Sequence, residues 1–332
     1  MVLILDAMGG DFAPLVPVKA AKLALEEGLP LSLVGDLDQI RPYLKQEGIQ
    51  ESQLELHDCK EFITMEESIN ALSLKKKSSM RVAFQLLKEG KGSAVVSAGH
   101  SGAMLALGLL ILKTLPGIER PCIAAMMPAK KGLVFLADAG ANVDCEPNQL
   151  LQFGILASVY LECIFNIENP KIALLNIGSE EGKGNQLAKE AYLLFQKSGL
   201  HFTGNLEGKA FFESDNDIVI TDGFAGNVLL KSVQGAVSYI KYQLKEEISK
   251  SLVSKVGAFF MRKALANLME KANYANYGGA PLLGLQDLGV VCHGSSQPKA
   301  IKQALQFAQW AIEKNMKEKM IAKVKALQTE KN

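Results

Sequence analysis

The sequence lacks the features of a secreted or membrane-spanning protein. Its five cysteines are scattered, with neither paired spacing nor a C-x-x-C motif, so we expect reduced thiols and a cytoplasmic location. The first residues are apolar, without the basic stretch and cleavage site of a signal peptide. The longest apolar run, residues 103–112, has about half the length that a membrane-spanning helix needs. We therefore exclude the disulfide-stapled, secreted and integral-membrane classes.

An excess of either charge is also missing. The chain has 36 Lys and Arg residues against 35 Asp and Glu residues, whereas a general nucleic-acid binder normally carries a basic excess or stripe. We expect no nucleic-acid partner. Apolar residues make up 48% of the chain, which is enough for a substantial core and argues against disorder.

Motifs for common cofactors are absent as well. There is no Walker loop, and no G-x-G-x-x-G follows the first apolar segment, so ATP and NAD have no specific support. The four histidines form no H-x-x-H or H-x-x-x-H pair and no cluster with cysteine, which argues against a zinc site. We expect neither a metal nor an organic cofactor.

What the sequence does contain is an alternation of short apolar segments with longer helical patterns. The apolar segments predict strands at residues 2–6, 31–34, 54–57, 94–97, 122–127, 133–138, 172–176, 218–221 and 290–292. Helices are predicted at residues 14–27, 79–89, 102–114, 148–165, 185–197, 227–247 and 299–325. The alternation predicts a doubly wound, mainly parallel sheet in a three-layer α/β/α fold. No linker divides the chain, so we expect a single α/β unit of two lobes over residues 1–332.

Glycine-rich turns follow six of the predicted strands. They span residues 6–11, 97–102, 138–142, 176–180, 221–227 and 292–296. Ligands of open α/β sheets bind outside the carboxyl ends of the strands, where free N–H groups and helix N-termini attract anions. Any single turn is explained equally well by the tight backbone that glycine permits. Together the six turns predict one anion-binding rim, with these binding residues: Asp6, Gly9, Gly10, Gly99, His100, Ser101, Gly102, Asp138, Asn142, Asn185, Asp222, Gly226 and His293.

Two residues in or just after these turns are the candidates for catalysis. Lys183 lies between two glycines and can neutralise a phosphate dianion, with Glu180 and Glu181 to hold it, although a solvated loop is the alternative. Asn227 either caps a helix or donates its amide to a reacting oxygen. Asp222 either orients a ligand or pairs with Lys183.

Two other residues have competing interpretations. Ser101 suits a phosphate or an oxyanion, but it also suits an ordinary helix N-cap. Cys292 beside His293 invites a thiol nucleophile, yet it ends an apolar strand, where a buried inert thiol is commoner.

Two basic segments suggest partners. Lys75, Lys76 and Lys77 form either a solvated face or a docking site for an acidic protein. Residues 245–273 contain an amphipathic helical pattern, which fits either an anionic membrane surface or a dimer contact. Its contact residues are predicted to be Val256, Phe259, Phe260, Arg262 and Lys263, and Met269 and Lys271 continue the two faces.

In combination these segments resemble the phosphate acyltransferase (PlsX) family of bacterial phospholipid synthesis. The resemblance rests on residues 6–14, 78–80, 97–103, 120–121, 138–142, 175–178, 183–185, 204–205, 222–228, 277–281 and 293–296. These motifs occur in order along essentially the whole chain. Two positions depart from the family pattern: His100-Ser101 stands where Asn-Thr is usual, and Ser73-Leu74 where arginines are usual.

The resemblance implies an acyltransferase that moves a long acyl group from acyl carrier protein to inorganic phosphate, giving acyl phosphate. It also implies an isocitrate/isopropylmalate dehydrogenase-like fold and a homodimer. A membrane glycerol-3-phosphate acyltransferase would consume the product, so we expect a cytoplasmic protein peripherally associated with the inner face of the membrane. Lys183 and Asn227 would be the catalytic residues, neutralising phosphate and stabilising the oxyanion.

Three other functions remain open at this point. An isocitrate-dehydrogenase-like 2-hydroxy-acid dehydrogenase would need a nucleotide and Mg²⁺, for which Asp138, Asp144 and Asp222 are available. A phosphate acyltransferase that uses coenzyme A would differ only in its donor. A non-catalytic scaffold at the membrane surface would use the 245–273 segment alone.

Overall fold

The computed structural model describes residues 1–67, 70–130, 132–272 and 279–329. Its strands form a mixed sheet of 11 strands in the order β3-β2-β1-β4-β11-β10-β5-β6-β9-β7-β8. The strands are β1 (Leu3–Asp6), β2 (Leu31–Gly35), β3 (Glu55–Asp58), β4 (Ala94–Ser97), β5 (Cys122–Ala129), β6 (Gly132–Ala137), β7 (Ile172–Asn176), β8 (Phe202–Glu207), β9 (Ile218–Ile220), β10 (Ala280–Leu283) and β11 (Leu288–Val291).

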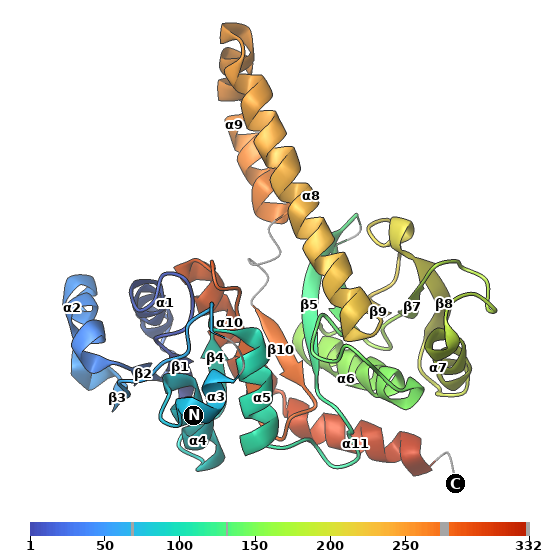
Figure 1. Cartoon of the computed structure of the whole chain (residues 1–332), viewed down its shortest axis with the longest axis horizontal. Helices are drawn as coiled ribbons and strands as arrows, with labels where there is room; N and C mark the ends of the chain where they lie inside the picture. Colours follow the sequence, from blue (N-terminus) through green and yellow to red (C-terminus); the bar gives the residue numbers. More distant parts are fainter. Residues whose placement is uncertain (68–69, 131, 273–278, 330–332) are drawn as a thin grey trace.

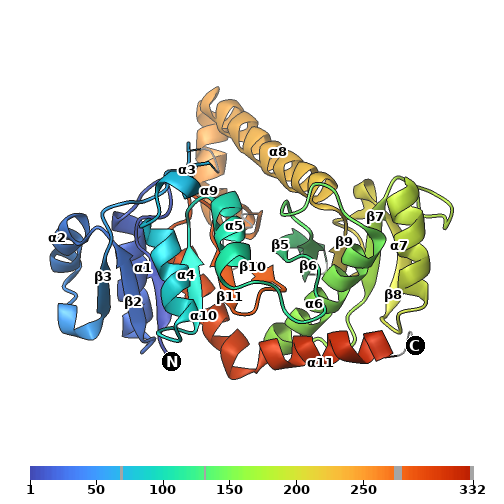
Figure 2. The ribbon, with the colours of Figure 1, turned by 60° about the horizontal axis from the view of Figure 1, so that its bottom comes forward.

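Helices cover both faces of the sheet, as Figures 1 and 2 show. They are α1 (Leu15–Glu26), α2 (Leu37–Glu47), α3 (Ala71–Leu74), α4 (Ser79–Lys88), α5 (Ser101–Ile111), α6 (Pro147–Phe165), α7 (Gln186–Gln196), α8 (Gly223–Ser249), α9 (Leu252–Ala272), α10 (Pro298–Glu313) and α11 (Met316–Thr329). One layer contains α1, α2, α10, α6, α11 and α7, and the other contains α4, α5 and the start of α8. The predicted three-layer α/β fold is therefore confirmed.

Strand direction reverses in the middle of the sheet. The pairs from β3 to β11 are all parallel, as are the pairs among β6, β9, β7 and β8. Between these groups, β10 and β5 make three successive antiparallel pairings. The strands of the second group consequently run opposite to those of the first. This reversal divides the sheet into the two lobes seen in Figure 2.

Several predicted elements differ from those in the structure. Strands β8 and β10 and helix α2 were not predicted. The predicted last helix, 299–325, is two helices, because Asn315 takes a left-handed φ of +52° between α10 and α11. The predicted helix 227–247 begins four residues earlier, at Gly223.

Helix α6 is long and apolar enough to cross a membrane. However, 72% of its apolar window is buried inside the protein, and Tyr160 of α6 stacks on Phe135 of β6 with 4.9 Å between the ring centroids. Helix α6 is therefore a core helix of the second lobe.

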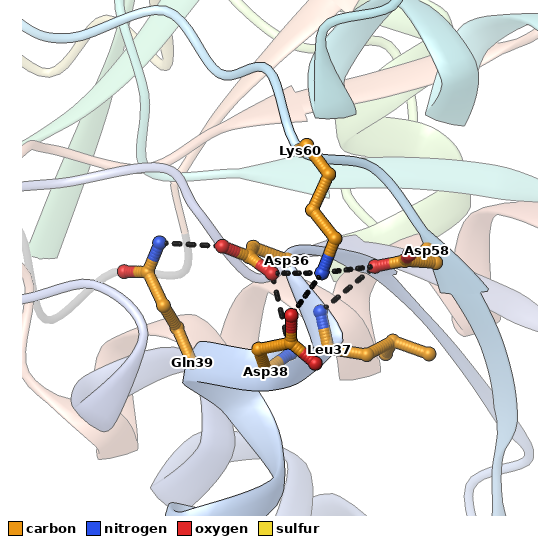
Figure 3. Close-up of polar contacts among 6 residues, drawn as sticks. All are labelled: Asp36, Leu37, Asp38, Gln39, Asp58 and Lys60. Atoms are coloured by element: carbon orange, nitrogen blue, oxygen red, sulfur yellow. Dashed lines mark hydrogen bonds and ion pairs between the residues drawn. The ribbon is translucent and has the colours of Figure 1, made fainter.

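A single lysine that contacts three carboxylates stabilises the edge of the first lobe (Figure 3). Lys60 Nζ lies 2.6 Å from Asp36, 2.7 Å from Asp38 and 3.3 Å from Asp58. Asp36 directly follows β2, and Asp58 is the last residue of β3. Their carboxylates also accept hydrogen bonds from backbone N–H groups in the first turn of α2. These contacts hold α2 to the ends of β2 and β3, so the cluster serves the fold.

Helices α8 and α9 form a hairpin that projects away from the sheet (Figure 1). It contains the amphipathic segment predicted at 245–273. Its side chains Val256, Phe259, Phe260, Arg262 and Lys263 are exposed. The side chains of Met269 and Lys271 lie outside the described ones, and residues 273–278, including Tyr277 of a family motif, lie outside the described residues.

Candidate active site

The turn after β1 is held against the turn after β4 by a buried carboxylate. Asp6 is 1% exposed, and it accepts hydrogen bonds from Ser97 Oγ at 2.7 Å and from Met8 N at 3.2 Å. Burial raises the pKa of Asp6, and these hydrogen bonds oppose the rise. Because its oxygens are used inside the protein, Asp6 positions the turns. This corrects its predicted role as a ligand-binding residue.

Close packing explains the two glycines of the first turn. A Cβ atom on Gly9 would lie 2.5 Å from Ser97 Oγ, and Gly10 has a left-handed φ of +103°. The next residue, Asp11, donates its N–H to Gly294 O at 2.9 Å and so joins this turn to the turn after β11. Gly9 and Gly10 thus allow the backbone to take this shape, and their predicted contact with substrate stays a prediction.

The turn after β6 folds around a second buried carboxylate. Asp138 is fully buried and accepts hydrogen bonds of 2.7–3.1 Å from four backbone N–H groups, those of Ile123, Gly140, Ala141 and Asn142. The Asn142 side chain donates to Asp138 and to a backbone carbonyl. Burial raises the pKa of Asp138 against the effect of these hydrogen bonds. Asp138 and Asn142 therefore shape the site, which corrects their predicted contact with substrate.

Helix α8 begins against this same turn. Its N-cap is Asp222, whose Oδ1 accepts the N–H of Ala225 at 2.8 Å. A Cβ atom on Gly226 would overlap the carbonyl oxygen of Asp138, so this glycine lets the helix approach the turn. The capping alternative for Asn227 is therefore wrong, because Asp222 is the cap. The binding role of Gly226 stays a prediction. The predicted pairing of Asp222 with Lys183 is absent among the described contacts, because Asp222 serves as the cap.

A cavity of about 500 Å³, here called the main cavity, lies where these turns converge. Four glycine turns reach it, those after β1, β4, β6 and β11. Its polar lining includes Asp11, Gly99, His100, Ser101, Gly102, Gly140, Asn227, Lys231, Gln234, His293 and Gly294. Its apolar lining includes Met65, Ile123, Ala125, Met126, Ala139, Leu230, Ala280, Val291 and Cys292. The cavity thus joins anion-attracting turns to apolar walls.

The N-terminus of α5 opens into the main cavity. His100 is the N-cap, and its Nδ1 accepts the N–H of Ala103 at 3.2 Å. Ser101 is the first helical residue and is exposed, so the N-cap alternative for Ser101 is wrong. The side chain of His100 takes the capping role. The amides of Ser101 and Gly102 border the cavity, where the positive end of the helix dipole attracts an anion.

Helix α8 supplies the other polar wall. Asn227 is exposed and lines the main cavity against Gly140. Lys231 and Gln234 lie four and seven residues further along, on the same face of the helix. Neither was predicted, because both lie inside a helix instead of a glycine turn. Helical spacing from Asn227 was the signal that would have found them.

The strand end at Cys292 does not supply a nucleophile. Cys292 is 3% exposed, and burial raises the pKa of its thiol to about 12, so the thiolate is scarce near neutral pH. His293 Nδ1 lies 2.7 Å from Ser295 Oγ. Burial and the nearby Lys231 lower the pKa of His293, against the effect of Asp11. The buried, inert thiol is therefore the correct interpretation of Cys292.

A separate cavity of about 470 Å³, the second cavity, receives the turns after β7 and β9. It is lined by Asn185 and Asp222, which cap α7 and α8 respectively. Lys183 lies in the loop at its border and forms an exposed ion pair with Glu180 at 3.9 Å. The turns therefore border two cavities instead of one rim: the turn after β6 borders the main cavity, whereas those after the parallel strands β7 and β9 border the second cavity.

The predicted docking lysines are not equivalent. Lys75 Nζ donates to Phe62 O and lies 2.7 Å from Glu67. Lys76 and Lys77 are exposed. Only the last two are available to a partner.

This fold defines an α/β protein with a cavity between glycine turns and apolar walls, and comparison with known proteins gives the family. The model of the family described as fatty acid synthesis protein matches residues 1–319. A phosphate acyltransferase of Geobacter sulfurreducens is 42% identical over 321 residues, covering 96% of this chain and 93% of the relative. One of Thermodesulfovibrio yellowstonii is 43% identical over 312 residues, covering 94% and 90%. The chain belongs to the phosphate acyltransferase family, as its motifs predicted.

Solved structures share the fold at low sequence identity. A phosphotransacetylase from Streptococcus pyogenes matches with a TM-score of 0.61 and 19% identity, covering 94% of both chains. A 4-hydroxythreonine-4-phosphate dehydrogenase from Klebsiella pneumoniae matches with a TM-score of 0.54 and 14% identity, covering 93% of this chain and 98% of that one. These neighbours support the α/β class.

The carboxylates suggested for a dehydrogenase metal site are not gathered in the structure. Asp138 is enclosed by its own turn, and Asp222 caps α8. Among the described residues, no three His, Cys, Asp or Glu side chains form a group that could hold a metal ion. The dehydrogenase alternative therefore has no support from the side-chain arrangement.

Proposed function

We propose that the protein transfers a long-chain fatty acyl group from acyl carrier protein to inorganic phosphate, forming acyl phosphate for phospholipid synthesis. As a member of its family it is an acyltransferase. The observation that carries the proposal is the main cavity, where the α5 N-terminus and Asn227 border the same space as apolar walls. Acyl transfer to phosphate needs an anion site, an oxyanion donor and room for an alkyl chain. The helix N-terminus, the Asn227 amide and the apolar walls of this cavity support these three requirements.

The chemistry follows from the groups at the cavity. A phosphate oxygen attacks the thioester carbonyl, the new C–O bond forms, the C–S bond breaks, and the carrier thiolate leaves and takes a proton from water. A thiolate with a free pKa of roughly 8.5 is a good leaving group, and phosphate is already anionic, so neither a strong acid nor a strong base is required. The amide of Asn227 or the α5 backbone amides stabilise the tetrahedral oxyanion.

The donor and the reaction are tested together. Purified protein is incubated with a long-chain acyl carrier protein and radiolabelled phosphate, without metal or nucleotide, and parallel samples contain the acyl-coenzyme A of the same chain length. We expect labelled acyl phosphate and free carrier thiol, with the carrier donor preferred. If only acyl-coenzyme A supported transfer, the proposed donor would be wrong and coenzyme A would take its place. NADH formation from 2-hydroxy acids without acyl transfer would overturn the proposed reaction.

The exposed lysines provide a prediction for carrier docking. Replacing Lys76 and Lys77 by glutamate is expected to raise KM for the acidic acyl carrier protein about 10-fold, because like charges repel across the interface, and to leave KM for acyl-coenzyme A unchanged. Initial-rate kinetics measure both constants. Lys88→Glu, an exposed lysine at the other end of α4, is the control and should behave like wild type. An unchanged KM for the carrier in the double variant would place docking elsewhere.

The hairpin is proposed to hold the protein at the cytoplasmic face of the membrane, beside a membrane glycerol-3-phosphate acyltransferase. Phe259 and Phe260 are 60% and 80% exposed, and Arg262 lies over the Phe259 ring, 4.3 Å from its centroid. Exposed aromatic rings next to cations suit an anionic lipid surface.

The corresponding prediction concerns vesicle binding. The double change Phe259→Ser and Phe260→Ser is expected to reduce sedimentation with anionic vesicles at least about 10-fold, because it removes buried apolar area at the interface. Leu193→Ser, an exposed leucine on α7, is the control. A double variant that still sediments but changes from dimer to monomer by light scattering would assign the hairpin to the proposed homodimer contact instead.

Two further expectations accompany the proposal. Lys183 retains its predicted catalytic role as a hypothesis, and its place at the second cavity makes it directly testable. The expected likeness of the fold to isocitrate and isopropylmalate dehydrogenases also remains a prediction, supported by the mixed, centrally antiparallel sheet.

A further inference from the structure

We propose that Lys231, together with the amide of Gln234, holds the phosphate that attacks the thioester. This inference rests on the proposed acyl transfer to phosphate. It assigns, within that site, the cation that neutralises the nucleophile.

Helical spacing places the two residues beside Asn227. Residues four and seven positions apart lie on one face of a helix with 3.6 residues per turn. Asn227, Lys231 and Gln234 have this spacing on α8, and all three line the main cavity. Helix α8 extends from the sheet into the projecting hairpin (Figure 2), and the row begins one turn after its first residue, Gly223. It therefore offers an amide, an ammonium group and a second amide to one ligand.

The charge of the cavity makes Lys231 necessary for a phosphate dianion. Helix N-termini such as that of α5 provide only about half a positive charge. Among the described residues that line the main cavity, Lys231 is the only lysine or arginine, whereas Asp11 contributes a carboxylate. Its ammonium group has no ion-pair partner in the described part of the chain. The Asp11 carboxylate disfavours an anion in this cavity. The Lys231 ammonium group, which has no ion pair within the described chain, offsets that charge and attracts a dianionic ligand.

Gln234 supplies an independent observation that points to a ligand. Its Nε2 atom is buried and has no hydrogen-bond partner among the described residues. A buried donor without a partner is costly, and here it belongs to a side chain that lines the main cavity. A phosphate oxygen would satisfy this donor.

Lys183, the predicted phosphate-binding lysine, is placed differently. It pairs with Glu180 at 3.9 Å and is absent from the lining of the main cavity. Its loop borders the second cavity through Gly184 and Asn185. A phosphate bound by Lys231 would lie in the main cavity, whereas a phosphate bound by Lys183 would lie at the second cavity.

The test measures binding of inorganic phosphate to the full-length protein by calorimetry, and KM for phosphate in the acyl transfer assay. Lys231→Ala is expected to weaken phosphate binding and raise KM for phosphate by about 10–100-fold, as for a lost charged hydrogen bond. Lys231→Arg should recover part of the loss. Lys245→Ala, an exposed lysine four turns further along α8, is the matched control. Lys183→Ala, measured in the same way, tests the alternative that phosphate binds at the second cavity.

A second measurement reports on the charge of Lys231 itself. His293 faces Lys231 and Asp11, and the ammonium group lowers the pKa of its imidazole. Phosphate should therefore raise the pKa of His293 in an NMR titration of wild type, and Lys231→Ala should raise it without phosphate.

The outcomes separate this inference from the proposed function. Unchanged phosphate affinity, KM and His293 titration in Lys231→Ala would overturn the assignment while wild-type acyl transfer still stands. A large loss in Lys183→Ala alone would move the phosphate to the second cavity. Phosphate binding that depends on Lys231 without any acyl phosphate formation would support the assignment and overturn the proposed function.

Discussion

Replacing Asn227 by alanine is expected to lower kcat for acyl phosphate formation by about 100- to 1,000-fold, the usual effect of removing one oxyanion donor. Asn227 is exposed at the main cavity, and Asp222 already caps the helix. The change therefore removes an amide donor without disturbing the fold, since alanine favours a helix. Steady-state rates and a thermal melt of the same sample measure the two effects.

Ser232→Ala provides the control for this prediction. Ser232 is exposed on the same helix and does not line the main cavity, so its variant should retain wild-type kcat. An Asn227→Ala enzyme with wild-type kcat would show that the oxyanion donors lie elsewhere, and the α5 amides would then be the remaining candidates.

Replacing Gly226 by alanine is expected to destabilise the protein by about 1–3 kcal/mol or more. The added Cβ would overlap the carbonyl oxygen of Asp138, a backbone atom in a turn held by several hydrogen bonds. Helix α8 would have to move away from that turn, and Asn227 would move with it. Chemical denaturation measures the loss of stability, and the kinetic assay measures the displacement of the site.

Gly235→Ala is the matched control on the same helix. Nothing lies within 4 Å of a Cβ atom at Gly235, so alanine should raise helix stability by roughly 0.5–1 kcal/mol. Equal stability changes in the two variants would contradict the packing account of the α8 N-terminus.

The strands that could be predicted from the sequence are continuous apolar runs buried between two helix layers. Those that escaped prediction have local patterns that conflict with their place in the sheet. β8 is an edge strand, and Gly204 interrupts it with a φ of +106°. β10 contains Pro281 although it lies in the middle of the sheet. Its pairing with β5 begins one residue later, at Leu282, which removes the need for an N–H at the proline.

The candidate site could be predicted only as a set of turns. Anion binding at these turns could be predicted, because a glycine turn followed by the start of a helix is a local pattern in the sequence. Their division between two cavities depends on tertiary packing, which has no local signal, since even the parallel strands β6, β7 and β9 end at different cavities. Asp6 and Asp138 were misjudged for a related reason, since nothing in the sequence distinguishes a carboxylate facing a ligand from one enclosed by its own turn. Lys231 was missed because it lies inside helix α8, one turn beyond Asn227, and not in a glycine turn.

The position of the bound phosphate tests the central claim most directly. Crystals of the wild-type protein soaked with arsenate, a phosphate analogue with strong anomalous scattering, would locate the anion. We predict one anomalous peak in the main cavity, within hydrogen-bond distance of the Ser101 amide or the Lys231 ammonium group. A peak beside Lys183 in the second cavity, with the main cavity empty, would contradict the account.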